Sequence, residues 1–230
     1  MTNDNSIIIV ISRFDFYYDD IKERLKDLTF DIYYFKSIEE FLSKGYEKSR
    51  VKFIFFPHYS KLISKEVFDE YFCVGFHTGN LPNDRGGSPI QNKIINGEYI
   101  TKVSAFRISE EIDSGEIYAD KLIDLSNGTI KDILHQISQK IADMVREIAI
   151  EVPLGKQQTE GIIRFSRINE ESSSLNLDNL DLRQIYDRIR MVDGYEYPKA
   201  YIEFETYYLI LFDAHLYDDK LTGRCEIIPK

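Results

Sequence analysis

The first 76 residues alternate short apolar runs with amphipathic stretches, and no other feature of the sequence constrains the fold as strongly. Ser6–Ile11 (SIIIVI) is continuous and β-branched, which is typical of a strand buried on both faces. Three more strand-like runs follow, at Phe30–Phe35, Val51–Phe56 and Phe72–Phe76. Helical patches separate them, the first at Tyr17–Leu28. A β-α-β-α order predicts a parallel sheet with right-handed crossovers, so we expect an α/β fold.

The middle of the chain predicts two further strands and one long helix. Ile100–Ile108 and Ile117–Leu125 supply the strand material. Thr129 with Asp132 then opens a helix whose apolar residues keep a 3.6-residue period for about six turns. Pro153 and the glycine two residues later end it. This helix is the most regular one that the sequence predicts.

The last quarter of the chain predicts a separate, smaller group of helices and strands. A polar stretch, Gln157–Asn179, is the natural linker. A helix at Leu182–Arg190 and two alternating strands, Ala200–Phe204 and Tyr207–Phe212, follow it. We therefore expect residues 1–160 to form a Rossmann-like domain with a mostly parallel sheet and helices on both faces. Residues 161–230 are expected to form a short C-terminal α+β region with a β-hairpin.

Composition narrows the classes of partner. The chain has 39 acidic and 29 basic residues, a net charge of −10. Such an excess of acid opposes binding that neutralises many phosphates, so we expect no nucleic-acid partner. Cys73 and Cys225 are too few for a disulfide scaffold. The polar start and the short apolar run after it predict neither a signal peptide nor a membrane helix, so we expect a cytoplasmic protein.

The loop after the third strand is the first candidate site. No glycine-rich fingerprint follows the first strand, which argues against a nicotinamide or flavin cofactor there. In an open α/β sheet, the loops at the carboxyl ends of strands form the ligand crevice. An apolar slot edged with backbone groups is one reading of the loop, and an ordinary connection with surface aromatics is the other. The loop contains Phe56, Pro57, His58, Tyr59, Ser60 and Leu62.

The loop after the fourth strand contains more residues that could bind a ligand or take part in a reaction. His77 ends that strand, and Asn80 follows it. The chain then runs through Arg85, Gly86 and Gly87 into Ser88-Pro89, which predicts an N-cap serine and a first-turn proline. A helix N-terminus beside an arginine and two glycines can bind an anion or stabilise a developing oxyanion. A purely structural Gly-Gly turn is the alternative.

Asp113 is the third candidate. It stands among four acidic residues around Gly115, a grouping that is usually a solvated face. Ser114-Gly115 directly after it predicts a turn that aims the carboxylate inward. If Asp113 meets His77 in the fold, the carboxylate would fix the tautomer and orientation of the imidazole. The four histidines form no metal-ligand spacing, and no metal is expected.

The segment that contains His77, Arg85 and Asp113 resembles a known family, the formyltetrahydrofolate-dependent formyltransferases. The resemblance rests on ordered motifs in "FHTGNLPNDRGGSPIQNKIINGEYITKVSAFRISEEIDSGEIY". The matching positions are His77, Leu81-Pro82, Arg85-Gly86, Pro89, Gly97, Thr101 and Asp113-Ser114-Gly115. Upstream, "FFPHYSKLISKEVF" resembles the folate-binding loop of the family, and "IYDRIRMVDGYEYPKAYI" resembles the start of its C-terminal region.

The resemblance implies transfer of a formyl group from N10-formyltetrahydrofolate, the co-substrate, to an amine, with no metal. His77 and Asp113 match two members of the family's Asn-His-Asp set. The position of the asparagine is Gly75 here, so either Asn80 or a backbone group would supply the missing donor, or oxyanion stabilisation is weaker. The residues implied for the co-substrate are Phe56, Pro57, His58, Tyr59, Ser60, Leu62 and Gly115. Those implied for the acceptor are Arg85, Gly86, Gly87, Ser88, Gln91, Tyr195 and Tyr197.

The form "RGGSPIQN" and the short C-terminal region look most like the sugar N-formyltransferases. The expected acceptor is therefore the amine of a nucleotide-linked amino sugar, in polysaccharide or O-antigen biosynthesis. Three alternatives stay open: another amine such as methionyl-tRNA, hydrolysis of formyltetrahydrofolate, and a binding module without catalysis. Tyr195 and Tyr197 would line the nucleotide-sugar site or only pack the tail. The apolar strands near the end of the chain are also candidates for a homodimer contact.

Overall fold

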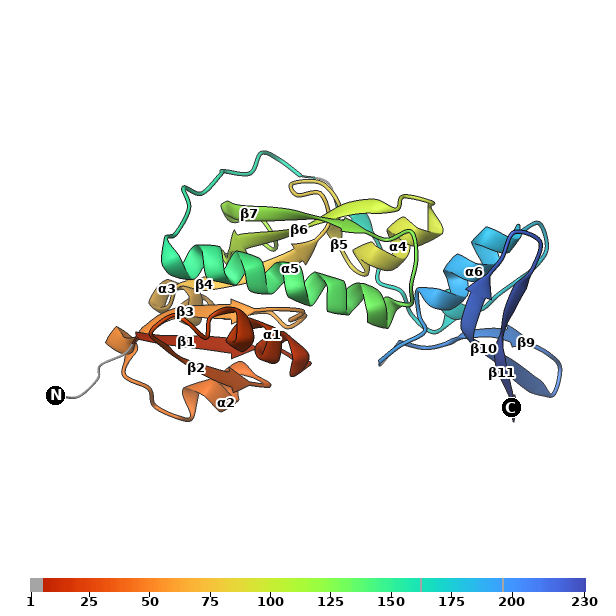
Figure 1. The fold of residues 1–230 in the computed structure, drawn as a ribbon, viewed down its shortest axis with the longest axis horizontal. Helices are drawn as coiled ribbons and strands as arrows, with labels where there is room; N and C mark the ends of the chain where they lie inside the picture. Colours follow the sequence, from red (N-terminus) through yellow and green to blue (C-terminus); the bar gives the residue numbers. More distant parts are fainter. Residues whose placement is uncertain (1–5, 162, 196) are drawn as a thin grey trace. The chain divides into compact units, whose positions relative to one another are not determined.

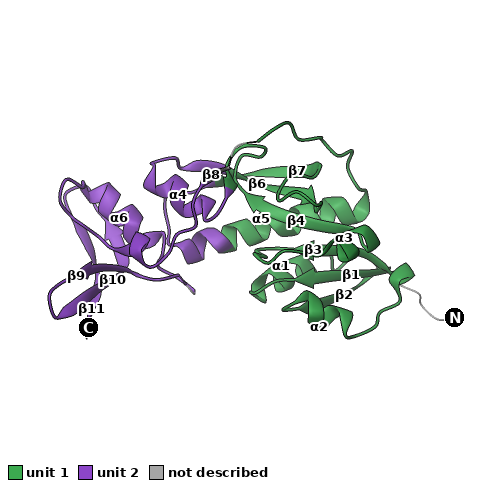
Figure 2. Ribbon diagram, turned by 180° about the vertical axis from the view of Figure 1, so that it is seen from behind, with its two compact units in different colours: residues 1–85, 102–123, 135–162 green, residues 86–101, 124–134, 163–230 purple. Residues whose placement is uncertain are grey.

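The computed structural model describes residues 6–161, 163–195 and 197–230, and these divide into two compact units (Figure 2). Unit 1 comprises residues 1–85, 102–123 and 135–162, and unit 2 comprises residues 86–101, 124–134 and 163–230. The sequence-based division after residue 160 thus differs from the compact units. Two segments from the middle of the chain, residues 86–101 and 124–134, belong to the same compact unit as the C-terminal region.

Unit 1 is built on a six-stranded sheet in the order β2-β1-β3-β4-β6-β7, which confirms the predicted α/β class. The strands are β1 (Ser6–Ile11), β2 (Phe30–Phe35), β3 (Val51–Phe56), β4 (Cys73–Thr78), β6 (Ile100–Arg107) and β7 (Ile117–Asp124). The first four run parallel, and β6 runs antiparallel to β4. Because β1 has β2 on one side and β3 on the other, the strand order reverses there, and the loops after these strands share one edge of the sheet.

Helices cover both faces of this sheet, as predicted (Figure 1). On one face, Ile7, Ile9 and Ile11 pack against α2 (Ile38–Leu42) and α3 (Lys65–Glu70). On the other face lie α1 (Phe16–Arg24) and α5 (Ile130–Ile150), and Arg146 of α5 pairs with Asp27 just beyond α1 at 2.5 Å. Helix α1 ends earlier than the predicted Leu28, although Leu25 remains buried as its C-cap residue. A short 3-10 helix, η1 (Lys48–Arg50), precedes β3.

Unit 2 contains a second, antiparallel sheet of three strands in the order β11-β10-β9. Its strands are β9 (Ala200–Glu203), β10 (Tyr207–Leu216) and β11 (Leu221–Pro229). The predicted hairpin is present, but the third strand was missed because its middle residues are polar and give no alternating pattern. The other elements are β5 (Arg85–Gly86), β8 (Ile163–Phe165), α4 (Pro89–Ile95), η2 (Glu171–Ser173) and α6 (Leu182–Arg190).

Helix α6 has the bounds that the sequence predicted, and a capping box explains its start. The side chain of Asp181 accepts the N–H of Gln184, whose own side chain accepts the N–H of Asp181. Its buried face carries Asp187, which accepts hydrogen bonds from Tyr99 at 2.6 Å and from Arg190 at 2.6 Å. A buried carboxylate in such a cluster is costly to remove, because its partner cation would stay buried.

None of the helices in the described part of the chain is long and apolar enough to cross a membrane. Across the same residues, no three histidine, cysteine or acidic side chains gather as ligands of a metal ion would.

Candidate active site

The site is built at the ends of two neighbouring parallel strands of unit 1. In the β3–β4 ladder, Phe56 is the partner of Gly75, so the loop after β3 starts beside the strand that carries His77. His77 lies in β4 and is 7% exposed. The sheet therefore fixes the backbone of the histidine, and only a small part of the ring is open to solvent.

Asp113 reaches His77 from the loop between β6 and β7. Its Oδ2 lies 3.3 Å from Nδ1 of His77, so the structure brings the two side chains together across 36 residues of sequence. The backbone of Asp113 is left-handed, with φ at 54°. Gly115 explains the tight turn after it, since a Cβ there would stand 1.8 Å from the carbonyl oxygen of Arg107. The glycine implied for co-substrate binding thus has a packing role.

Both ring nitrogens of His77 face acceptors. Nδ1 faces the Asp113 carboxylate, and Nε2 lies 2.9 Å from the backbone carbonyl oxygen of Asp84. A neutral imidazole carries one N–H and can satisfy only one of these acceptors, whereas the imidazolium satisfies both. Asp84 is 2% exposed, and its carboxylate accepts the backbone N–H of Asn80 at 3.2 Å. In this conformation the ring is held at both ends.

Gln158 connects the Asp113 loop to Arg85. Its amide Nε2 donates to the carbonyl of Asp113 at 2.9 Å and to the carbonyl of Gly115 at 2.7 Å. Its Oε1 accepts from Arg85 at 3.1 Å. The other terminal nitrogen of the Arg85 guanidinium, Nη1, forms an ion pair with the Glu111 carboxylate at 3.2 Å. Sequence reasoning missed Gln158 because it lies in the polar stretch predicted to be a linker, where nothing marks one amide among several.

Gly75 stands where the family carries an asparagine, and a phenyl ring fills the space beside it. A Cβ on Gly75 would lie 2.7 Å from Cζ of Phe106 and 3.0 Å from its Cε1. Asn80, the expected substitute, is exposed, and within the described residues its side chain makes no hydrogen bond to His77. The structure therefore offers an apolar wall at Gly75 in place of a side-chain donor.

The loop after β3 divides into a buried and an exposed part. Phe56 and Pro57 are buried, and the ring of Tyr59 packs on Phe56 with 5.3 Å between centroids. Burial raises the pKa of Tyr59. The His58 ring lies 5.3 Å from that of Phe14, which follows β1, so the loops after β1 and β3 touch. Ser60 is exposed, and Leu62 is 81% exposed, so the outer part of the loop presents an apolar side chain to solvent.

The remaining candidate residues lie in unit 2. Ser88 occupies the N-cap position of α4, but its hydroxyl accepts the N–H of Ile168 at 3.1 Å, so the predicted side-chain cap of α4 is wrong. The cause is its left-handed backbone, with φ at 48°, which turns the hydroxyl away from the helix. Gly86 is exposed and has φ at 120°, and a Cβ on Gly87 would meet the backbone of Arg167 at 2.8 Å.

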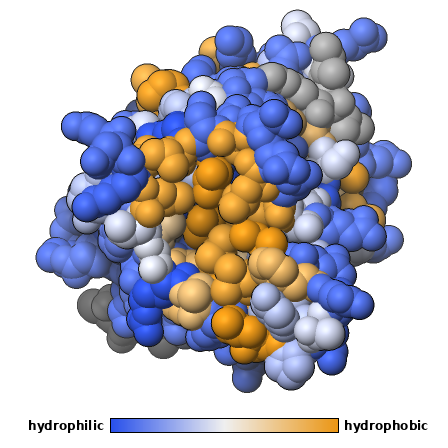
Figure 3. All heavy atoms as spheres, turned by 90° about the vertical axis from the view of Figure 1, so that its right-hand side faces the viewer, coloured by the Kyte–Doolittle hydropathy of each residue, from blue (hydrophilic) through white to orange (hydrophobic). Residues whose placement is uncertain are grey.

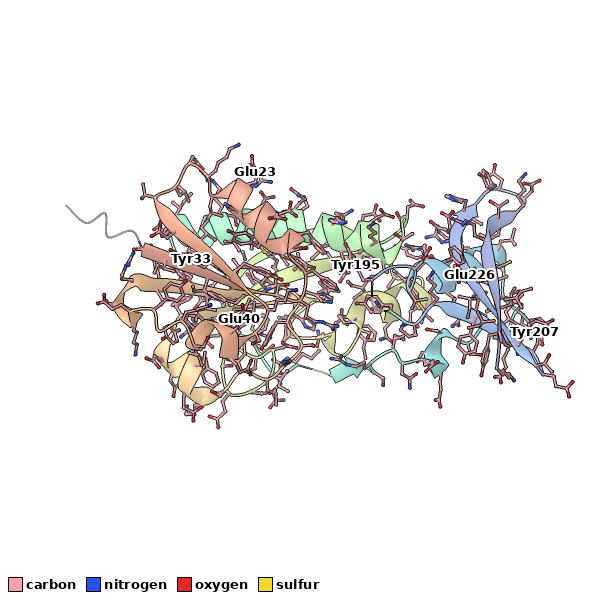
Figure 4. The ribbon with its side chains drawn as sticks, turned by 90° about the horizontal axis from the view of Figure 1, so that it is seen from below. Glu23, Tyr33, Glu40, Tyr195, Tyr207 and Glu226 are labelled. Atoms are coloured by element: carbon pink, nitrogen blue, oxygen red, sulfur yellow. The ribbon has the colours of Figure 1, made fainter. Side chains whose placement is uncertain are left out.

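Gln91 and the two tyrosines of the tail differ in exposure. Gln91 is 1% exposed, and its Nε2 has no hydrogen-bond partner among the described residues. Tyr195 is 37% exposed with φ at 51°, and Figure 4 labels it on the loop after α6. Tyr197 is half-buried. Their part in acceptor binding stays a prediction.

Comparison with known proteins identifies the family of the chain. A family profile described as "Formyl transferase" matches residues 5–152, and one described as "Methionyl-tRNA formyltransferase, C-terminal domain" matches residues 170–228. The methionyl-tRNA formyltransferase of Campylobacter lari is 28% identical over 179 residues, which are 76% of this chain and 57% of that protein. The chain thus spans about half the length of the curated relatives it matches.

Two solved structures share the fold. A methionyl-tRNA formyltransferase from Clostridium thermocellum superposes with a TM-score of 0.87 at 31% identity, over 98% of this chain and 100% of that one. A 4-N formyltransferase from Francisella tularensis superposes with a TM-score of 0.65 at 16% identity, over 87% of this chain and 93% of that one. Because the first profile covers well over half of the residues and the second most of the tail, this chain belongs to the formyl transferase family.

Proposed function

We propose that this protein transfers the formyl group of N10-formyltetrahydrofolate to the amine of a nucleotide-linked amino sugar. The observation that carries the proposal is the His77–Asp113 pair, 3.3 Å apart at the end of β4. A histidine with a carboxylate on one ring nitrogen can act as a general base toward a reacting amine.

In the proposed mechanism, the bound co-substrate supplies the formyl carbon. The attacking amine nitrogen gains positive charge and must release a proton. Nε2 of His77 takes that proton once the Asp84 carbonyl, which lies 2.9 Å away, has given up its place to the substrate. Asp113 on Nδ1 keeps the ring oriented and stabilises its positive charge. The protonated ring then donates to the oxyanion, where Gly75 offers no side-chain donor. Collapse of the tetrahedral intermediate breaks the bond between the formyl carbon and N10 of the co-substrate. The imidazolium returns its proton to N10, so tetrahydrofolate leaves and His77 is neutral again.

The loop after β3 suits the folate part of the co-substrate. A pterin is a flat ring with polar edges, and small-molecule sites combine apolar walls with a few backbone donors and acceptors. Leu62 offers the apolar surface, and the backbone from Pro57 to Ser60 offers the polar edge. Holding the formyl carbon near the amine supplies the proximity contribution to the rate.

The charge of the chain favours a small acceptor over a polynucleotide. A net charge of −10 repels a long polyanion, and a protein that binds one releases counterions only where it offers many cations. The diphosphate of one nucleotide-linked sugar needs only a few local hydrogen-bond donors. A sugar N-formyltransferase from Shewanella also shares the fold, over 87% of this chain and 93% of that one, with a TM-score of 0.60 at 18% identity.

Methionyl-tRNA is the second candidate acceptor. The observation that favours it is the match to the Clostridium thermocellum structure, whose identity is higher and whose whole chain is covered. On this alternative, the same His77–Asp113 pair would act on the amine of the methionyl group.

One assay separates these candidates. The purified chain is incubated with N10-formyltetrahydrofolate and either a panel of dTDP-, UDP- and GDP-linked amino sugars, methionyl-tRNA, or no amine. Formylation of one nucleotide-sugar class, seen as a mass shift, is the expected result. Formylation of methionyl-tRNA alone would establish the second candidate, and release of formate without any amine would indicate a hydrolase.

The site assignment has its own test. His77→Ala and Asp113→Asn should each abolish transfer while the circular dichroism spectrum stays unchanged. Retained transfer in both variants would refute the role proposed for the pair.

A further inference from the structure

Strand β11, the open edge of the small sheet in unit 2, exposes two neighbouring isoleucines near its end. Figure 3 views the side of the molecule on which β9, β10 and β11 lie in Figure 1, and apolar side chains gather there in one patch. Ile227 is 67% exposed and Ile228 44% exposed, both on β11. The other edge strand is different, because residue 175 donates its N–H to the carbonyl of Tyr201 and so covers β9. Strand β11 is thus the edge that offers pairing groups.

We propose that β11 pairs with β11 of a second copy of this chain, antiparallel and centred on Cys225, to form a symmetric dimer. In such an isologous contact, a residue pairs with the residue equally far from Cys225 on the other side. The charge pattern selects this centre. Arg224 of one copy lies opposite Glu226 of the other, and the pair occurs twice. Centring on Arg224 or on Glu226 would instead set like charges opposite each other.

The hydrogen-bonding pattern of the edge agrees with this register. The N–H of Lys230 donates to the carbonyl of Thr206, and the ladder with β10 alternates from there. The even-numbered residues of β11 near Cys225 therefore bond to β10, and Cys225 and Ile227 turn their N–H and C=O groups to the open edge. Among the described residues, neither Arg224 nor Glu226 forms an ion pair within the chain, although the Arg224 guanidinium lies 5.3 Å from the Phe212 ring centroid.

Side-chain shapes also fit. In the proposed register Ile227 of each copy lies opposite Gly223 of the other. Gly223 lines a pocket of about 220 Å³ between α6 and the sheet, whose other walls include Ile185, Leu209 and Leu211. Ile227 lies on the same face as Leu209, its partner in the β10–β11 ladder. The exposed isoleucine of one copy is thus placed at the mouth of the apolar pocket of the other.

The helices leave room for the pairing. Helix α6 packs on β10, and two β10 strands separated by a pair of β11 strands lie about 14 Å apart at the usual strand spacing. An α-helix with its side chains is about 10–12 Å wide, so the two α6 helices would fit side by side over the paired β11 strands. Within unit 2, the strand and helix spacings therefore allow the pairing.

Charge reversal tests the register. Sedimentation equilibrium at low salt should find the natural chain dimeric. Arg224→Glu alone or Glu226→Arg alone should raise the dimer Kd at least about tenfold, because each turns two attractive pairs into two repulsive ones. The double variant Arg224→Glu/Glu226→Arg should dimerise again, and an equimolar mixture of the two single variants should form a heterodimer.

Cross-linking tests the centre of the contact. Mild oxidation should join two chains through Cys225, and Cys225→Ser should abolish the product, since Cys73 is buried. Unchanged circular dichroism spectra and melting temperatures exclude unfolding as the cause of dissociation. A natural chain that stays monomeric would overturn the proposal and leave the patch to another kind of partner. A dimer whose Kd is the same in the natural chain and in all three charge variants would overturn it as well. Neither readout depends on formyl transfer.

Discussion

Gln158 offers the sharpest test of how the site is held. The left-handed backbone of Asp113 costs about 1 kcal/mol or more, and Gln158 donates hydrogen bonds to the carbonyls of Asp113 and Gly115 at 2.9 and 2.7 Å. Two such bonds contribute about 1–3 kcal/mol in total, which is comparable to the backbone cost. Without them, the loop is expected to leave the conformation that brings Asp113 to His77.

The substitution Gln158→Leu removes both donors, and Gln158→Glu replaces them with acceptors of nearly the same shape. A loss of about 1–3 kcal/mol lowers the population of the competent loop, so kcat/KM should fall about 5- to 150-fold. Gln157→Leu is the matched control, because among the described residues the Gln157 amide donates only to the half-buried Glu116 carboxylate, in an exposed hydrogen bond away from Asp113. This variant should leave kcat/KM unchanged.

The ring of His77 gives a readout that needs no substrate. The chain has four histidines, so the ¹⁵N resonances of His77 can be assigned by comparison with His77→Ala. Both Gln158 variants should shift these resonances, and Gln157→Leu should not. Equal activity and equal spectra in all three variants would refute the role of Gln158 as a positioning residue. A spectral change without any formyl transfer in the natural chain would instead count against the proposed function.

Three further predictions concern packing and burial. Gly75→Asn should lower the free energy of unfolding by about 1–3 kcal/mol, and Phe106→Ala in the same chain should recover part of the loss, as urea denaturation would show. Asp187→Asn should cost about 3–5 kcal/mol, because it leaves buried arginine charge without its partner. In a Cys225→Ser chain, Cys73 should resist a maleimide at pH 8 until the protein unfolds, since burial raises the pKa of its thiol to about 12.

Each of these has a contrary outcome. If Gly75→Asn left the free energy of unfolding unchanged, the Phe106 ring would have to move aside freely. An Asp187→Asn chain as stable as the natural one would mean that its arginines reach water. The raised pKa of Cys73 also predicts that stability is lost between about pH 9 and pH 12, as the unfolded thiol ionises while the folded one stays neutral. A folded chain that gains stability over this range would contradict the assigned burial.

How far the sequence could predict the site follows from the range of the interactions. Local patterns predicted β1 to β4, the bounds of α6 and the histidine at a strand end, because these depend on neighbouring residues. Spacing alone does not predict that His77 and Asp113 meet. That prediction rests on the order of the motifs, which resembles the order in a known family. β11 was missed because a strand exposed on both faces carries no period in its hydropathy.

The sequence by itself determined the α/β class and the family, and it predicted the loops in which we expect the chemistry. Only the tertiary structure decided what stands around the imidazole: the Asp84 carbonyl at one nitrogen, the Phe106 ring against Gly75, and the Gln158 amide behind Asp113. It also decided that two segments from the middle of the chain join the C-terminal unit. The physical reason is that local order depends on a few adjacent residues, whereas these contacts join positions that only the completed packing of the chain brings within a few ångströms.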